Sequence, residues 1–255
     1  MLSNLRPRLA SGPCLGVSCR MARTPDIAHM LRDTGYSWMF LDFEHGPLSF
    51  DQLSQMALAG VEAGVTPLVR LPDAGEAAIH RVLSNGAMGI IIPHVNDPET
   101  AAFVARQCRF PPHGTRSVPG ILPQLGYAPT TFAEAADKLN PATLCVVMIE
   151  SPEALDAIDE IASVDGVDVL FVGASDLSFT LGTPSEYGHP GMVSAMEKVA
   201  EAARRHGKHC GFGGVSDPVI AQRYIAMGHR LILAGNDQTM FLQGARARHA
   251  ALTGG

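Results

Sequence analysis

Short apolar runs alternate with longer amphipathic segments along nearly the whole chain. The eight apolar runs cover residues 14–18, 38–42, 66–71, 88–95, 143–150, 167–173, 208–214 and 229–235. They are apolar throughout rather than alternating with polar residues, which is typical of strands covered on both faces. We therefore predict eight buried parallel strands.

The segments between these runs have the spacing of helices. They cover residues 24–35, 49–64, 75–86, 97–110, 151–164, 192–207, 217–228 and 237–252. Parallel neighbours need a crossover connection, so eight strands each followed by a helix predict an α/β fold of the closed (β/α)8 or TIM-barrel type. A Rossmann sheet is the rival fold, but no G-x-G-x-x-G motif follows the first run, and no nucleotide cofactor is expected.

One domain covering residues 1–255 is the preferred organisation, because the chain shows no internal linker and no low-complexity tract. The longest irregular stretch, residues 109–131, is rich in proline and glycine. A loop of that length in a compact domain is usually functional or forms an interface.

Composition narrows the class of partner. The net charge is −6 and no basic run is present, which argues against nucleic acid. No apolar stretch approaches the length of a membrane span. The five cysteines are scattered and odd in number, Cys14 and Cys19 are poorly spaced for a metal, and the N-terminus lacks an apolar signal core. We expect reduced thiols in a cytoplasmic protein.

In barrels of this kind the active site lies at the carboxyl ends of the strands. Ionisable and polar residues gather at those positions here: Asp42, Glu44, His45, Arg70, Glu150, Asp176, Gly213-Gly214 and Gly235-Asn236. Their occurrence on neighbouring strand ends is more informative than any one of them.

Glu150 and Asp176 are the natural metal pair, because two carboxylates suit hard cations such as Mg²⁺ or Mn²⁺. Alternatively, each carboxylate caps the helix that follows it. Arg70 is either a structural ion-pair partner or a bidentate clamp for the oxygens of a keto acid. His45 is either a core imidazole or a base that Asp42 orients. Together the four positions favour function.

Lysines are absent from the predicted carboxyl ends of the strands. The chain has only Lys138, Lys198 and Lys208, so neither a Schiff-base lysine nor a pyridoxal phosphate enzyme is expected. The glycine-rich stretch 211–217 is either a phosphate cradle or a tight turn beside the substrate.

Several stretches resemble the HpcH/HpaI aldolase family, the metal-dependent class II pyruvate aldolases of the phosphoenolpyruvate/pyruvate-binding barrel type. The resemblance covers about residues 14–245. Its landmarks are "LDFEHGP" (41–47), "PLVR" (67–70), "GAMGIIIPHV" (86–95), "RFPPHGTRS" (109–117), "VVMIESPEAL" (146–155), "VDGVDVLFVGASDLS" (164–178) and "AGND" (234–237).

The resemblance implies roles for individual residues. Glu150 and Asp176 would bind a divalent metal (Mg²⁺, Mn²⁺ or Co²⁺), and Arg70 would steady the keto oxygen as it becomes an enolate. His45, oriented by Asp42, would act as the base through a water molecule. The amide of Ser175 and the side chain of Met148 would belong to the substrate pocket.

The chain departs from the family pattern in three places. "GASDLS" replaces the more usual "GPADLS", and Met148 stands where many members have glutamine. Ser84 stands where many members have an aspartate that reaches the site of a neighbouring subunit. The second departure affects the polar contacts around the metal, and the third affects handling of the acceptor.

The implied activity is reversible cleavage of a 4-hydroxy-2-oxoacid to pyruvate, or a similar 2-oxoacid, and an aldehyde, as in the breakdown of aromatic compounds or sugar acids. The implied assembly is a hexamer built as a trimer of dimers, with the C-terminal helix at about residues 237–252 exchanged between subunits. Two alternatives remain: a citrate-lyase-β-like lyase acting on an acyl-CoA thioester, and a keto-acid-binding barrel without turnover. The histidine of "DFEH" favours the aldolase.

Overall fold

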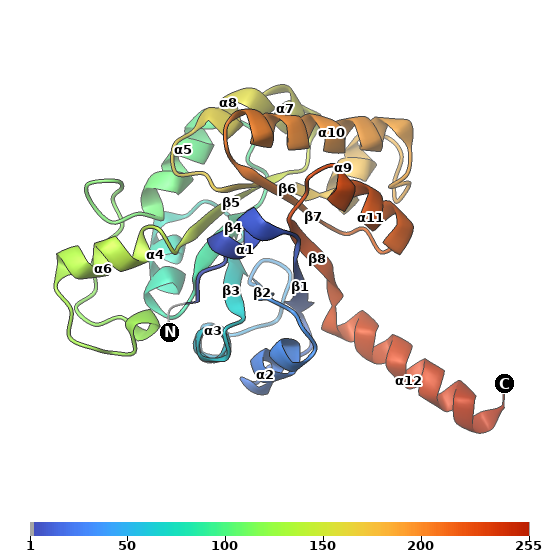
Figure 1. The fold of residues 1–255 in the computed structure, drawn as a ribbon, viewed down its shortest axis with the longest axis horizontal. Helices are drawn as coiled ribbons and strands as arrows, with labels where there is room; N and C mark the ends of the chain where they lie inside the picture. The colour runs from blue at the N-terminus through green and yellow to red at the C-terminus, as the bar shows by residue number, and fades with distance from the viewer. Residues whose placement is uncertain (1–2, 255) are drawn as a thin grey trace.

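A computed structural model describes residues 3–254. Eight parallel strands close into a barrel in chain order (Figure 1). The strands are β1 Cys14–Cys19, β2 Trp38–Asp42, β3 Thr66–Arg70, β4 Gly89–Ile92, β5 Leu144–Ile149, β6 Val169–Gly173, β7 His209–Gly213 and β8 Leu231–Asn236. The predicted (β/α)8 fold and all eight predicted strands are confirmed.

Helices connect successive strands and cover the outside of the barrel, apart from α1, which precedes β1, and α12, which follows β8 (Figure 1). They are α1 Arg6–Ser11, α2 Asp26–Asp33, α3 Phe50–Ala63, α4 Glu76–Ser84, α5 Pro98–Gln107, α6 Phe132–Leu139, α7 Pro152–Asp156, α8 Ile158–Ser163, α9 Ala174–Thr180, α10 Pro190–Arg205, α11 Pro218–Ala226 and α12 Asp237–Thr253, with a 3₁₀ turn η1 at Pro123–Leu125. The predicted helix 151–164 is interrupted at Ala157 and forms α7 and α8.

Three short helices, α1, α6 and α9, were not predicted. Each has eight residues or fewer, so the helical period repeats too few times to stand out. α6 nevertheless carries a sequence signal, because Thr131 and Glu134 form a capping box at its start. The proline-rich stretch before it masked that signal.

Side-chain alternation along the strands places the functional positions. In β2, Trp38 and Phe40 belong to the cluster inside the barrel, whereas Met39 and Leu41 pack outward against the helices. In β5 the alternating positions 144, 146 and 148 are likewise inside. Because the period of a strand is two residues, the next inward positions are Asp42 and Glu150 at the carboxyl ends.

The opposite end of the barrel is closed by α1. Leu5 and Leu9 are buried in the interior cluster with Trp38, whose indole Nε1 donates to the carbonyl oxygen of Cys14 at 3.0 Å. Gly16 faces this ring, and a Cβ there would clash with it. This end of the barrel is therefore filled by side chains and provides packing rather than a binding site.

The C-terminal helix α12 leaves the barrel and extends away from it (Figure 1). Residues 241–254 are all exposed. All five cysteines are buried and none is in a disulfide, as expected for reduced thiols. Within residues 3–254, no helix combines the length and apolarity needed to cross a membrane.

Candidate active site

A cavity of about 400 Å³ opens at the carboxyl ends of the strands. Six of the predicted site residues line it: Asp42, Arg70, Met148, Glu150, Ser175 and Asp176. Gly213 and Gly214 line it too, and Gly214 lies next to Ser175. His45 is not part of the wall, and Ser84 is the last residue of α4. Among these six residues the largest separation along the chain is 134 positions, between Asp42 and Asp176 (176 minus 42).

Asp42 and Arg70 form a bidentate ion pair across neighbouring strands. Arg70 Nε donates to Asp42 Oδ1 at 3.0 Å, and Arg70 Nη2 donates to Oδ2 at 2.8 Å. Asp42 is only 1% exposed. Burial alone would raise the pKa of this carboxyl, but the hydrogen bonds and positive charge of Arg70 hold it below its usual value. Asp42 therefore carries a stable negative charge that fixes Arg70.

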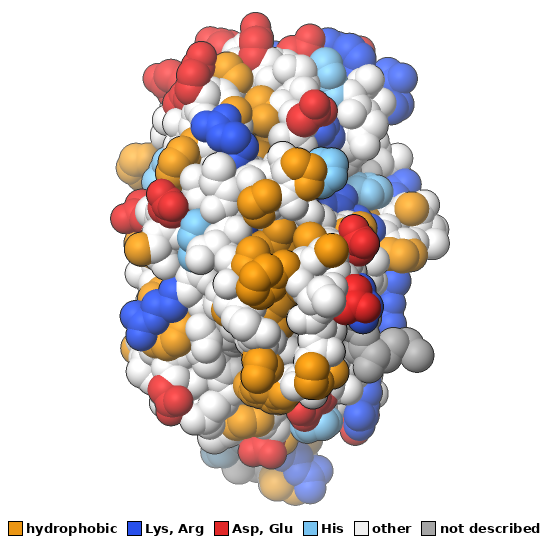
Figure 2. Space-filling model, turned by 90° about the vertical axis from the view of Figure 1, so that its left-hand side faces the viewer, with side chains coloured by type: hydrophobic (Ala, Val, Ile, Leu, Met, Phe, Trp, Pro, Cys, Tyr) orange, Lys and Arg blue, Asp and Glu red, His pale blue; other side chains and the backbone are white. Residues whose placement is uncertain are grey.

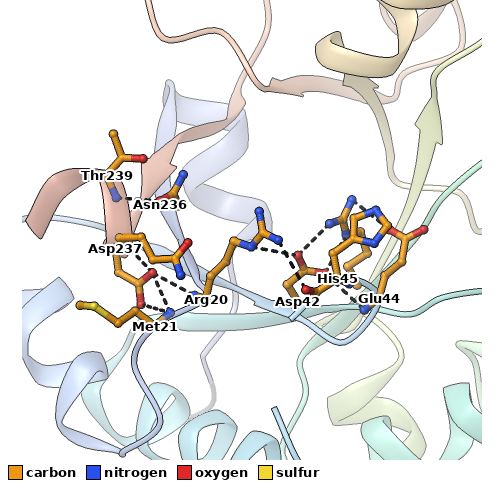
Figure 3. A network of polar contacts seen from close by, with 10 residues as sticks. Arg20, Met21, Asp42, Glu44, His45, Asn236, Asp237 and Thr239 are labelled. Carbon is orange, nitrogen blue, oxygen red and sulfur yellow. Dashed lines mark hydrogen bonds and ion pairs between the residues drawn. The ribbon is translucent and has the colours of Figure 1, made fainter. Parts of the chain in front are cut away.

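The position of His45 differs from the expectation that Asp42 orients its ring. Asp42 Oδ1 accepts from the backbone N–H groups of Glu44 and His45, at 3.2 and 3.1 Å. The carboxylate beside the imidazole belongs to Glu44, whose Oε2 lies 3.6 Å from His45 Nε2 (Figure 3). The His45 side chain is 61% exposed. Asp42 shapes the loop, and the exposed His45 side chain is not among the residues that line the cavity.

Glu44 also contacts Arg70, with Oε2 3.0 Å from Nη1. Arg70 is therefore held by two carboxylates, and its side chain is only 13% exposed. The sequence pattern included Glu44 but did not indicate this role, because a residue in a turn can point to either side.

Glu150 is a buried carboxylate with one oxygen held by the protein. It is 2% exposed, and Oε2 accepts from the backbone N–H of His94 at 3.0 Å. The ring atom His94 Nδ1 lies 3.3 Å from the same oxygen. The other oxygen, Oε1, lies against Gly173, where a Cβ would clash with it. Burial raises the pKa of Glu150.

Asp176 lies in the first turn of α9, is exposed, and shares the cavity with Glu150. The helix-cap alternative does not hold for Glu150, because the Ser151 side chain caps α7 instead. Among residues 3–254, no group of three or more histidine, cysteine or carboxylate side chains is arranged around a common metal position. A cation here would therefore take two protein carboxylates, and its other ligands would come from substrate and water.

The sequence analysis did not identify His94 as a candidate site residue. The predicted strand 88–95 included this residue, but β4 ends at Ile92 and His94 has a left-handed backbone with φ of 53°. The signal was Pro93, because proline is disfavoured within a central strand. This backbone conformation aims the His94 amide at Glu150.

Arg20, at the end of β1, was also missed. The first predicted strand ends at residue 18, whereas β1 continues to Cys19. Arg20 therefore directly follows the carboxyl end of β1, and it lines the cavity. Its loop is anchored by Asp237, whose carboxylate accepts from the backbone N–H groups of Arg20, Met21 and Ala22 at 3.0, 2.9 and 2.7 Å (Figure 3).

Comparison with known proteins gives consistent matches over most of the chain. The family model described as HpcH/HpaI aldolase/citrate lyase matches residues 21–244. The 4-hydroxy-4-methyl-2-oxoglutarate aldolase tasA of Hapsidospora irregularis is 37% identical, over 91% of this chain and 87% of its own. A 2-keto-3-deoxy-L-rhamnonate aldolase of Klebsiella pneumoniae is 32% identical, over 88% and 83%. The crystal structure of an HpcH/HpaI aldolase from Desulfitobacterium hafniense superimposes with a TM-score of 0.91 at 29% identity, over 98% and 96%.

Proposed function

The chain belongs to the HpcH/HpaI aldolase/citrate lyase family and is an aldolase-type lyase, and from this premise we propose that it reversibly cleaves a 4-hydroxy-2-oxoacid to pyruvate, or a similar 2-oxoacid, and an aldehyde. One observation carries the proposal. Glu150, Asp176 and Arg70 line one cavity at the carboxyl ends of the strands. Such a cavity combines a place for a hard cation with a guanidinium for keto-acid oxygens.

Glu150 and Asp176 would hold the divalent cation, which we propose to be Mg²⁺, Mn²⁺ or Co²⁺. The donor set fits, because both side chains offer carboxylate oxygens and the His94 amide fixes Glu150 by one oxygen only. A bound cation would supply positive charge that favours the enolate form of the 2-oxoacid.

The remaining roles follow from position. Arg70, held rigid by Asp42 and Glu44, would place its positive charge near the oxygen that becomes the enolate oxygen. Ser175 and Met148 line the same cavity, and the Ser175 amide and the Met148 side chain would contact the 2-oxoacid. His45, on the loop that follows Asp42, would remove the proton from the C4 hydroxyl through a water molecule.

We propose that the protein works as a single-domain subunit of a cytoplasmic homo-hexamer, a trimer of dimers in which α12 packs on a partner. The support is exposed apolar surface. Phe241 and Leu242 of α12 are exposed, as are Ile121, Tyr127 and Phe132. Figure 2 shows hydrophobic side chains gathered across the middle of one face of the molecule. Sedimentation of the full chain and of a chain ending at residue 239 tests this, because only the full chain should form the hexamer.

Exchange of the methyl protons of pyruvate with deuterated solvent tests the proposed chemistry without knowledge of the aldehyde. We expect proton NMR to show exchange with Mn²⁺ and none after EDTA treatment, because exchange reports enolate formation. Absence of exchange with Mg²⁺, Mn²⁺ and Co²⁺ alike would contradict the proposal. Cleavage of citramalyl-CoA or malyl-CoA under those conditions would then identify the acyl-CoA lyase alternative.

A further inference from the structure

We propose that Asp237 is a positioning residue of the active site. Its carboxylate holds the loop after β1 (residues 20–25), and this loop in turn holds the loop after β2 (residues 43–49), which carries Glu44 and His45. The inference rests on the aldolase function proposed above. It deepens that function by giving a role to a residue that does not itself line the cavity.

The carboxylate of Asp237 is buried at the start of α12 and binds a loop that is far away in the sequence. Oδ1 accepts from the backbone N–H of Arg20 at 3.0 Å, and Oδ2 accepts from those of Met21 and Ala22 at 2.9 and 2.7 Å. Oδ1 also accepts from the N–H of Gln238, in its own helix, at 2.9 Å. Asp237 is 8% exposed. Because a buried carboxylate depends on such donors, the contact fixes the loop after β1 to the start of α12.

The loop after β1 holds the loop after β2 through two arginine side chains. Arg20 Nη2 donates to the carbonyl oxygen of His45 at 3.4 Å, and Arg23 Nη1 donates to that of Pro47 at 3.2 Å. Figure 3 shows Arg20 reaching from Asp237 toward the loop of His45. The loop after β1 therefore connects α12 to the loop that carries the proposed base.

The loop after β2 needs this second attachment because its own strand holds only one side of it. Asp42, at the end of β2, accepts from the backbone N–H groups of Glu44 and His45. The Glu44 side chain contacts Arg70, with Oε2 3.0 Å from Nη1. Asp237 thus acts on Arg70 and His45 only through other residues, which makes it a positioning residue.

The contacts of Asp237 exceed what a helix cap needs. A carboxylate that only capped its own helix could be replaced by asparagine at little cost, because one side-chain oxygen is enough for capping. Here both oxygens are used, and their donors come from two segments of the chain. In either orientation, an asparagine amide would present its own N–H groups to backbone N–H groups. Asp237→Asn therefore removes contacts to the loop while it keeps the size of the side chain.

Hydrogen–deuterium exchange of the full chain, measured by mass spectrometry, tests the connection without any substrate. We expect Asp237→Asn to raise the exchange rates of the amides in residues 20–22 and in residues 43–46 by roughly tenfold or more, as for loss of buried hydrogen bonds. A double variant, Arg20→Met with Arg23→Met, should raise the rates in residues 43–46 alone, because Asp237 still holds residues 20–22.

Asp97→Asn is the matched control. Asp97 caps α5, and its hydrogen bonds within residues 3–254 are to Thr100 alone, with Oδ1 accepting from the backbone N–H at 2.7 Å. Its substitution makes the same chemical change at the start of a helix that holds no second loop through this carboxylate. Amide exchange in residues 20–22 and 43–46 should therefore stay as in the wild type.

A second readout uses the proposed chemistry. With saturating Mn²⁺, Asp237→Asn should lower the rate of pyruvate methyl exchange by roughly 10- to 100-fold, because Arg70 and His45 lose their productive positions. The affinity for Mn²⁺ should not change, since Glu150 and Asp176 follow other strands. A general loss of structure would lower both quantities. Asp97→Asn should change neither.

Faster amide exchange in residues 20–22 of Asp237→Asn without any change in residues 43–46 would overturn the inference, because Asp237 would then hold only the first loop. Unchanged rates in residues 43–46 of the double variant, which keeps Asp237, would overturn it as well. So would a wild-type rate of pyruvate exchange in Asp237→Asn. Failure of the aldolase function is distinguishable, since the wild-type protein would then show no exchange of the pyruvate methyl protons, whereas amide exchange would still report the connection.

Discussion

Each end of the barrel holds a buried aspartate between arginines, and the two ends use it differently. At the end closed by α1, Asp168 pairs with Arg6 at 2.6 Å and Arg109 at 2.7 Å and accepts from the Cys145 amide at 2.7 Å. At the carboxyl end, Asp42 pairs closely with Arg70 but lies 3.9 Å from Arg20.

The two ends of the barrel differ in whether a helix closes them. At the closed end, α1 contributes Arg6 to the ion pair with Asp168, and Leu5 and Leu9 pack into the interior cluster beside it, so these charges belong to the packing of the fold. Within residues 3–254, no helix closes the other end in the same way, and Asp42, Arg20 and Glu150 line an open cavity there. The same pair of residue types is therefore enclosed in the fold at one end and lines an open cavity at the other.

The largest expected effect is at the closed end. We expect Asp168→Ala to lower the free energy of unfolding by about 3–5 kcal/mol, because Arg109 is 9% exposed and would lose its carboxylate. Denaturant unfolding measures this. Asp165→Ala, at an exposed position in the same loop, is the control and should change little. Equal stability of the two variants would show that Arg109 finds another partner.

At the open end we expect Glu150→Gln to lower the rate of pyruvate exchange by on the order of a hundredfold or more, because a charged oxygen of the proposed cation site is lost. Stability should not fall, since the amide keeps the side-chain volume and an oxygen for the His94 N–H. Mn²⁺ titration followed by electron paramagnetic resonance should show weaker binding. Glu153→Gln, on exposed surface, is the control. Full exchange in Glu150→Gln would remove Glu150 from the site.

A smaller effect should separate the backbone of His94 from its ring. His94→Gly keeps the amide and suits a φ of 53°, whereas His94→Val disfavours that conformation. We expect Mn²⁺ affinity to fall by roughly tenfold in the valine variant and by less in the glycine variant. Equal losses in both would indicate that the ring, whose Nδ1 is 3.3 Å from Glu150, provides the support.

The smallest effect concerns acid stability. The pKa of Asp42 is lowered in the folded protein, so its ionised form adds stability above the unfolded-state pKa of about 3.8. That contribution is lost as the pH falls through the lower folded-state pKa. The difference in unfolding free energy between the wild type and Asp42→Asn should be constant near neutral pH and shrink below about pH 3.8.

Asp137→Asn, at an exposed position of α6, should show no such trend across the same pH range. If the difference in unfolding free energy between the wild type and Asp42→Asn already shrinks near neutral pH, then Arg70 does not hold down the pKa of Asp42.

The sequence by itself determined the barrel and the strand-end wall of the cavity. The strand-end rule places Asp42 and Glu150 at the carboxyl end from the sequence alone. That both residues point inward follows from the alternation that the structure shows along β2 and β5. The strand-end rule likewise identified Arg70 and Asp176, which line the cavity.

Only the tertiary structure decided which loop side chains meet. Arg20 is held by Asp237, 217 residues away, and the His94 amide reaches Glu150, 56 residues away. The ring of His45 approaches Glu44 rather than Asp42. The physical reason is that a strand's alternation sets the direction of its side chains locally, whereas the direction of a loop residue depends on hydrogen bonds from distant parts of the chain.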